Sequence, residues 1–107
     1  MHRELGPGLL ESAYEECLCH EFRLRNLVFR RQIDLPVHYK GLNLACGYRI
    51  DLLVNDSVVV ELKAVPRLLP VHEAQLITYL RLSGKRVGLL INFDVSVLKN
   101  GIVRRVL

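Results

Sequence analysis

The chain has 107 residues, half of them hydrophobic, with 15 lysines and arginines against 11 aspartates and glutamates. This length predicts one domain over residues 1–107, with a core that needs neither a structural metal nor disulfides. The net charge of +4 suits a polyanionic partner without demanding one. The odd cysteine count and apolar neighbours favour reduced thiols in the cytoplasm, and no apolar run is long enough for a membrane. The cysteines are Cys17, Cys19 and Cys46.

The first expected helix begins after Gly6-Pro7-Gly8 and ends near Asn26, which suits a left-handed cap. Glu15 and Glu16 belong to its solvent side. Glu11 lies on the border of the apolar face at the helix N-terminus, where the helix dipole favours an acid. The apolar residues that recur at helical spacing are Leu10, Ala13, Tyr14, Cys17, Leu18 and Leu24.

Alternation of apolar and polar residues predicts a half-exposed strand over residues 28–39. Pro36 within it indicates a sheet edge or a break in pairing, because proline has no amide N–H to donate. Lys40-Gly41 then turns the chain into a second strand over residues 44–54. Asn55-Asp56 is a turn signal into a third strand.

The third strand, Ser57 to Val65, carries the densest β-branched run of the chain, which is typical of a central strand covered on both faces. Glu61 and Lys63 interrupt this run, and their spacing of two places both side chains on one face. Charges on a covered strand are costly unless they are paired or used. The two residues are therefore either a solvated pair on an outer face or part of a site.

A second helix is expected from Pro70 to a glycine cap at Gly84, followed by a short buried strand over residues 86–93. Residues 94–107 suggest a small hairpin around Asn100-Gly101. The element order of helix, three strands, helix and strand predicts an α/β fold. Its mixed central sheet would be flanked by helices.

Several polar residues stand in otherwise apolar company in this pattern. Carboxylates of Asp51 and Glu61 on adjacent strands offer hard oxygen ligands to Mg²⁺, which needs few ligands from the protein. A lysine beside the metal can orient or deprotonate water and stabilise developing negative charge. Each has an ordinary alternative, since Asp51 could pair with an arginine and Gln75 could cap a backbone group. The full set is Glu11, Asp51, Glu61, Lys63 and Gln75.

Asp51 together with Glu61-Leu62-Lys63 resembles the core motif of the PD-(D/E)XK nuclease superfamily. The element order αβββαβ is similar to its restriction-endonuclease-like core. The stretch Gly8-Leu9-Leu10-Glu11-Ser12-Ala13-Tyr14 resembles the signature of the GxxExxY family, a compact prokaryotic branch of that superfamily. Other stretches similar to that family are Glu61-Leu62-Lys63-Ala64, His72-Glu73-Ala74-Gln75-Leu76 and Gly88-Leu89-Leu90-Ile91-Asn92-Phe93.

The resemblance implies a phosphodiesterase that uses Mg²⁺ or Mn²⁺ on DNA or RNA. Its implied metal ligands are Asp51, Glu61 and the Leu62 carbonyl, with Lys63 serving the attacking water. Glu11 would belong to the outer metal shell. Gln75 would position Lys63 or the substrate backbone. Family members usually begin upstream of this sequence, so we expect the first helical region to be truncated here.

Three other interpretations bear on function. The first is a non-catalytic nuclease-fold module that binds nucleic acid or a protein, against which the intact acid and lysine set argues. The small size favours help from a homodimer or a protein partner. A zinc site at Cys17-x-Cys19-His20 is disfavoured, because the two thiols point to opposite sides of a helix. The paired arginines are interpreted as solvated surface rather than phosphate contacts. They are Arg23/Arg25, Arg30/Arg31 and Arg104/Arg105.

Strand register links the fold to this site. A two-residue turn at Asn55-Asp56 would place Asp51 opposite Val60, and Glu61 would then point to the other face. A three-residue loop that includes Ser57, or a bulge, would place Asp51 opposite Glu61 instead. The turn signal favours the first arrangement and the site motif favours the second. We predict the second, with Glu11 and Gln75 approaching from helices that cover the same face.

Overall fold

The computed structural model describes residues 1–45 and 47–107. Its helices are α1 (His2–Leu5), α2 (Glu11–Leu24) and α3 (Pro70–Ser83), with a 3₁₀ turn η1 (Leu98–Gly101). Its strands are β1 (Phe29–Asp34), β2 (Val37–Tyr39), β3 (Leu42–Leu44), β4 (Arg49–Val54), β5 (Val58–Lys63), β6 (Val87–Asn92) and β7 (Ile102–Val106). Among the helices of these ranges, none combines the length and apolar character needed to cross a membrane.

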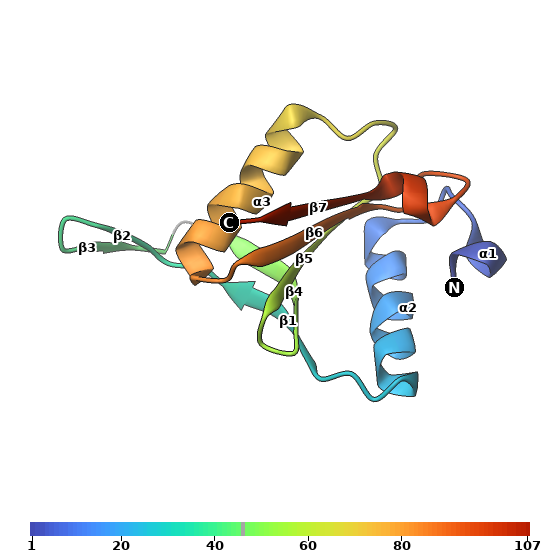
Figure 1. Ribbon diagram of the computed structural model, residues 1–107, viewed down its shortest axis with the longest axis horizontal. Helices are drawn as coiled ribbons and strands as arrows, with labels where there is room; N and C mark the ends of the chain where they lie inside the picture. Colours follow the sequence, from blue (N-terminus) through green and yellow to red (C-terminus); the bar gives the residue numbers. More distant parts are fainter. Residues whose placement is uncertain (46) are drawn as a thin grey trace.

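The described strands form a five-stranded sheet in the order β1-β4-β5-β6-β7 and a separate two-stranded sheet, β2-β3. Strands β1, β4 and β5 form an antiparallel meander. Strand β6 returns parallel to β5 after α3, and β7 pairs antiparallel with β6. Figure 1 shows α2 and α3 on either side of this sheet. The predicted α/β fold with a mixed central sheet flanked by helices is confirmed.

Two hydrophobic clusters fill the two faces of the sheet. Helix α3 packs Leu76 and Leu80 against Val59 and other residues of one cluster. Helix α2 packs Tyr14 and Cys19 against the other face, whose members include Leu52, Val60 and Leu62. Alternation along β5 therefore places Val59, Glu61 and Lys63 on the α3 side.

Gly88 on β6 explains how closely α3 approaches the sheet. A Cβ at this position would lie 2.7 Å from Leu76 Cδ1, well inside van der Waals contact. The glycine therefore lets the helix settle directly onto β6. At the end of α3, Gly84 takes the expected left-handed cap, with a φ of 73°.

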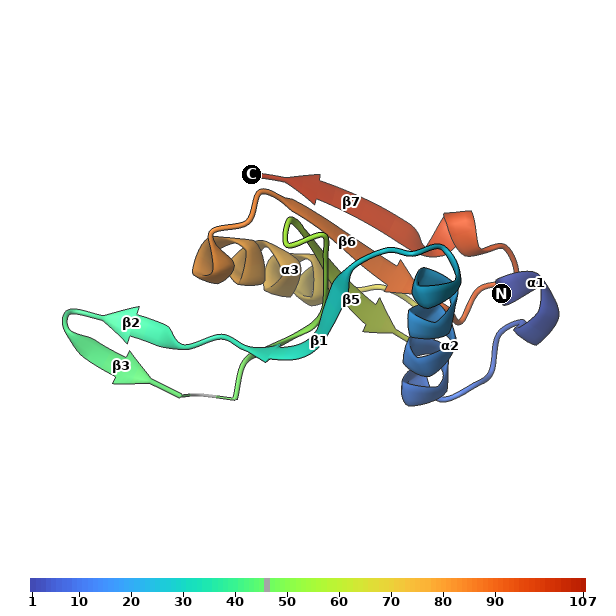
Figure 2. The ribbon, with the colours of Figure 1, turned by 90° about the horizontal axis from the view of Figure 1, so that it is seen from below.

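The first two predicted strands are each interrupted. The alternating stretch over residues 28–39 divides at Leu35-Pro36 into β1 and β2, and the stretch over 44–54 divides into β3 and β4. Lys40-Gly41 forms the predicted turn, with φ values of 46° and 84°. The β2-β3 hairpin projects away from the main sheet (Figure 2). The prediction for Cys46 falls on a residue outside the described ranges.

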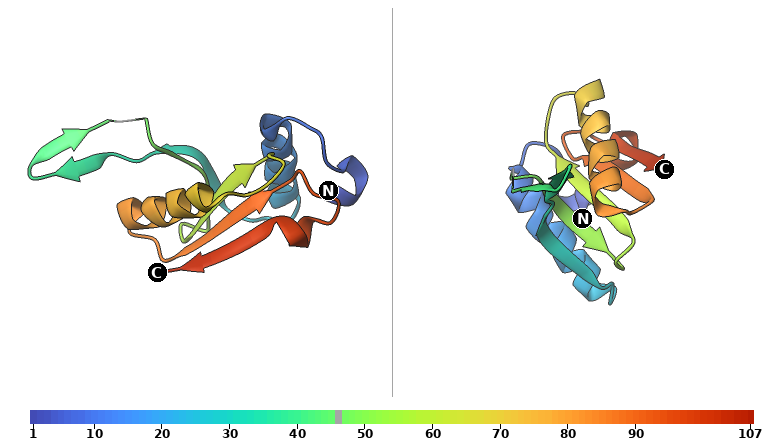
Figure 3. Two further views of the ribbon diagram at one scale, coloured as in Figure 1. Left: turned by 90° about the horizontal axis from the view of Figure 1, so that it is seen from above. Right: turned by 90° about the vertical axis from the view of Figure 1, so that its left-hand side faces the viewer.

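The predicted hairpin over residues 94–107 is wrong. Asn100-Gly101 closes the η1 turn, with the Asn100 amide donating to the Val97 carbonyl at 3.0 Å. The following strand, β7, pairs with β6 from Ile102 beside Ile91 onward. Apolar residues of β7 thereby pair along the edge of the sheet rather than with their own preceding segment. Figure 3 shows β7 running beside β6 along this edge.

Candidate active site

The β4–β5 register brings Asp51 opposite Glu61, as the site motif predicted. The ladder joins Leu52 to Val60, Leu53 to Val59 and Val54 to Val58. Asn55 and Asp56 both have left-handed φ, 52° and 54°, and the Ser57 amide donates to the Val54 carbonyl at 3.1 Å. The tight turn favoured by local sequence therefore forms, and Ser57 is the additional residue that shifts the register.

The two strands separate where the carboxylates begin. The Asp51 amide donates to Glu61 Oε1 at 3.0 Å, and the Leu62 amide donates to Asp51 Oδ2 at 2.8 Å. Each carboxylate thus binds a main-chain amide of the opposite strand in place of a backbone carbonyl. The described β4–β5 ladder stops at Leu52–Val60, whereas β5 continues beside β6 to Lys63.

Burial disfavours the charged forms of this pair of carboxyl groups. Glu61 is only 5% exposed, and burial followed by repulsion from Asp51 raises its pKa to about 8. Burial also raises the pKa of Asp51, while the Leu62 amide hydrogen bond opposes that rise. Within residues 1–45 and 47–107, neither carboxylate forms a salt bridge. A cation would therefore relieve the charge of this pair.

Lys63 lies two residues after Glu61 on β5, and hydrogen bonding to the end of β6 fixes its backbone. It pairs with Asn92 of β6, and its carbonyl accepts the Phe93 amide at 2.9 Å. Asn92 is 2% exposed, and its side-chain amide accepts from the Val65 N–H at 3.0 Å and donates to the Val65 carbonyl at 2.9 Å. A buried amide thus fixes the direction of the chain just after Lys63.

Glu11 reaches the pair from an unexpected side. It is the first residue of α2, and its pKa is raised by burial and by Asp51 and lowered by Lys63. The charges of Asp51 and Lys63 therefore act on its carboxylate. The prediction that its helix covers the Glu61 face is wrong, because α2 packs on the opposite face. Glu11 lies where the helix begins, so its side chain can approach at the end of the strands.

Gln75 and Tyr79 lie on the same helix but differ in their surroundings. Gln75 is exposed, and its side chain has no hydrogen-bond partner within the described ranges, so its role stays a prediction. Tyr79, one turn later, is buried, and its pKa is raised by burial and then by Glu61 and Asp51. The only sequence signal for Tyr79 was the helical face it shares with Gln75.

Sequence reasoning also missed Gln32 of β1 and Glu15 of α2. Glu15 was expected on the solvent side, yet its side chain is only 13% exposed. Its Oε1 accepts from Gln32 Nε2 at 2.8 Å, and its Oε2 accepts from Arg31 Nη2 at 2.6 Å. Both Gln32 and Glu15 affect the pKa of Asp51. Neither residue carries a local pattern that separates it from ordinary surface.

Five of the eleven arginines form salt bridges within the described ranges. Arg30 binds Asp56, and Arg31 binds Glu15 and Glu16. Arg25 pairs with Glu21 and Arg105 with Glu73. Four of the six paired arginines are thus engaged by acids, and the interpretation of the pairs as surface groups stays a prediction.

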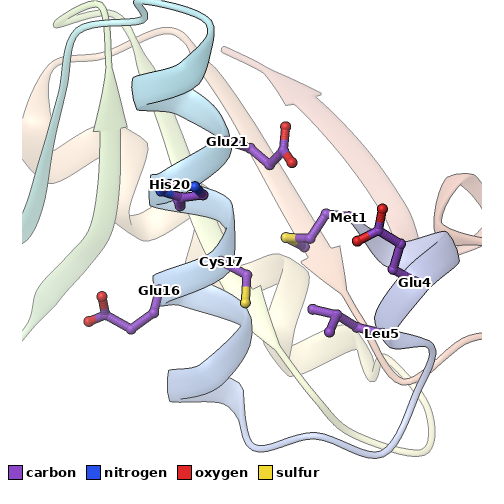
Figure 4. Close-up of a pocket in the computed structure, with 7 residues that line it drawn as sticks. All are labelled: Met1, Glu4, Leu5, Glu16, Cys17, His20 and Glu21. Carbon is purple, nitrogen blue, oxygen red and sulfur yellow. The ribbon is translucent and has the colours of Figure 1, made fainter.

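A cavity of about 300 Å³ lies apart from the carboxylate pair, between α1 and α2. Figure 4 shows Cys17 pointing from α2 toward Leu5, and Glu16 and His20 of the same helix also line this cavity. Within residues 1–45 and 47–107, no three or more His, Cys, Asp or Glu residues are grouped to hold a metal ion. The lining residues are Met1, Glu4, Leu5, Glu16, Cys17, His20 and Glu21.

Comparison with known proteins gives one match. The family model described as the PD-(D/E)XK nuclease superfamily matches residues 1–106. No curated protein and no solved structure matches the chain.

Proposed function

The chain belongs to the PD-(D/E)XK nuclease superfamily, and we propose that it hydrolyses phosphodiester bonds of DNA or RNA with Mg²⁺ or Mn²⁺. The strongest support is the cross-strand pair of Asp51 and Glu61. Two acids share the point where the β4–β5 ladder ends, and Lys63 follows on the same face. We also propose that the chain belongs to the GxxExxY branch of this superfamily.

The chemistry of the donor set fits a hard divalent cation. Asp51 and Glu61 each bind one backbone amide, which leaves carboxylate lone pairs for other ligands. Burial and then repulsion from Asp51 raise the pKa of Glu61, and Lys63 lowers it only in part, so a divalent cation at this position would favour the ionised carboxylate. Mg²⁺ keeps several of its waters and is commonly held by one or two carboxylates, so the absence of a three-residue cluster in the described ranges is compatible with it. The Leu62 carbonyl is the proposed third ligand.

The remaining residues act on water and substrate. When bound, the cation would acidify water and offset charge on the phosphate. Lys63 would orient the attacking water and stabilise negative charge on the phosphoryl oxygens. Glu11 would accept hydrogen bonds from water at the edge of the site, and Gln75 would position Lys63 or the substrate backbone.

Nucleic acid is the proposed partner because the chain belongs to a nuclease superfamily and carries a net charge of +4. Five of the eleven arginines pair with acids in the described ranges, which reduces the cationic surface that one chain offers to a phosphate backbone. A second copy or a protein partner would enlarge it. We place the protein in the cytoplasm on the basis of its cysteine content.

A nuclease screen tests this function. Single-stranded, duplex and structured DNA and RNA would be incubated with Mg²⁺ or Mn²⁺ and wild type, Lys63→Ala or Lys99→Ala. Lys99 is an exposed cation on η1 and serves as the matched control. We expect cleavage by wild type and Lys99→Ala, and a loss of at least about 100-fold in Lys63→Ala. Equal cleavage by Lys63→Ala would overturn the mechanism.

The same screen separates the catalytic function from a binding module. Nucleic-acid binding without cleavage under every metal condition would favour the non-catalytic interpretation. Circular dichroism of Lys63→Ala would confirm that any loss of activity is not a loss of fold.

A further inference from the structure

We propose that Gln32 is a positioning residue that orients the Asp51 carboxylate, and that Glu15 and Arg31 hold Gln32 in place. This inference rests on the proposed function, because it concerns the site that Asp51 would supply. Gln32 lies on β1, directly across from Asp51 on β4. The pairs that flank it are Arg31 with Leu52 and Ile33 with Ile50.

The backbone of Gln32 is unusual for a strand residue. Its φ is 50°, a left-handed value that residues other than Gly, Asn and Asp rarely adopt. The ladder between β1 and β4 pairs the residues on both sides but not Gln32 with Asp51. Such strain persists only where surrounding structure enforces it, and it gathers at functional sites.

This irregularity coincides with a change of face in both strands. On β1, Phe29 packs in the α2-side core and Ile33 in the α3-side core. On β4, Leu52 packs in the α2-side core and Ile50 in the α3-side core. Asp51 therefore lies at the crossing point, where regular alternation alone would not fix the direction of its side chain.

A chain of polar contacts holds the Gln32 side chain at this point, where the regular β1–β4 pairing is interrupted. Gln32 Nε2 donates to Glu15 Oε1 at 2.8 Å. Arg31 donates through Nε and Nη2 to the other oxygen, Glu15 Oε2, at 3.2 and 2.6 Å. Arg31 also binds Glu16 at 2.6 Å. Both oxygens of the mostly buried Glu15 carboxylate are thus occupied, which anchors the Gln32 amide to α2.

The Gln32 amide has two N–H donors, so one can bind Glu15 while the other serves Asp51. The register places Gln32 across from Asp51, so a hydrogen bond from this second N–H would fix the direction of the carboxylate. Arg31 offsets the charge of Glu15, the acid that holds the first N–H.

A purely conformational role makes a different prediction. If residue 32 only shapes the turn of the strand, glycine should serve at least as well, because it adopts left-handed φ without a steric penalty. A positioning role requires the amide itself. Gln32→Gly removes the amide and relaxes the backbone, so it separates the two roles.

The test measures the Mn²⁺ dissociation constant by titration calorimetry and the metal-free melting temperature for wild type and variants. We expect Gln32→Gly to melt no lower than wild type yet to bind Mn²⁺ about 10-fold more weakly, as loss of a group that orients a ligand commonly does. Gln32→Asn tolerates the same backbone but shortens the reach to Asp51, so its affinity should fall similarly. Unchanged affinity in both variants would overturn the positioning role.

A double variant tests whether Gln32 acts through its contact with Glu15. Glu15→Ala alone should weaken Mn²⁺ binding, whereas adding it to Gln32→Gly should cause no further loss, because both act through one contact. Additive losses would overturn the anchoring by Glu15. Asp51→Asn shows whether the Mn²⁺ that wild type binds occupies the proposed site. Wild type with no Mn²⁺ binding, or with binding that Asp51→Asn leaves intact, would overturn the proposed metal site and this inference together.

Discussion

The two ends of the β4–β5 hairpin differ in how their strands are joined. At the turn end, apolar residues from Leu52 to Val54 pair with Val58 to Val60 through a regular ladder. At the open end, Asp51 and Glu61 bind each other's strands through side chains, and that ladder stops. The closed end is held by regular backbone pairing, whereas at the open end each carboxylate binds one amide and keeps lone pairs for other ligands. A site can thus lie where two strands of a sheet begin to separate.

Truncation of a closed-end core residue should have the largest effect on stability. Leu52 is fully buried in the α2-side core. We expect Leu52→Ala to lower the free energy of unfolding by about 3 kcal/mol through lost burial and a cavity. Urea denaturation would measure this loss. Asp51→Asn, one residue away at the open end, is the matched control, and an equal loss there would contradict the division of roles.

A smaller loss is expected from the buried amide that supports the open end. Asn92→Ala would leave the N–H and C=O of Val65 without their partners. We expect about 2 kcal/mol of destabilisation from these unsatisfied groups. Cleavage should fall by more than stability explains, because the chain direction after Lys63 is released. Asn43→Ala, an amide on the projecting hairpin, is the control, and similar activity loss there would contradict the prediction.

The same contrast explains what the sequence could foretell. The closed end has strong local signals, namely a β-branched run and a turn dipeptide, so the strands, the central position of β5 and the mixed sheet were all predicted. The register was harder, because Asn55-Asp56 alone indicated a two-residue turn. The motif of Asp51 and Glu61 resolved it, since acids on opposite faces could not share an ion. Ser57 reconciles the two signals by following a tight turn as an extra residue.

What escaped prediction depends on contacts between distant segments. Glu15 has the spacing of a solvent-facing helix residue and becomes enclosed only because Arg31 and Gln32 of β1 lie against it. The left-handed φ of Gln32 has no signature in a sequence that alternates normally on both sides. The pairing of β7 with β6 likewise joins segments that local sequence does not connect, whereas the break at Pro36 was predicted from its missing N–H.

Metal binding at the open end of the hairpin should stabilise the folded protein. An ion that binds only the folded protein stabilises it by about 1.4 kcal/mol at ten times its dissociation constant. We therefore expect Mg²⁺ or Mn²⁺ to raise the melting temperature of wild type by several degrees. Asp51→Asn should reduce the shift, and Asp56→Asn, an acid at the turn end, should not. Equal shifts in both variants would mean that the ion binds elsewhere.

The last expected effect is a pH dependence of stability that originates at Glu61. Its folded-state pKa of about 8 lies above its usual value of 4.5. Between these values the folded protein holds a proton that the unfolded chain has released, so stability falls as pH rises through this window. Metal-free wild type should therefore melt at a lower temperature at pH 8 than at pH 5.5, relative to Glu61→Gln, whose amide does not titrate. Glu4→Gln, an exposed change on α1, should follow wild type. Melting curves recorded across this range with a chelator present would measure the slopes. Parallel slopes for wild type and Glu61→Gln would show that the open end carries no excess charge, and the contrast between the two ends would then be one of geometry alone.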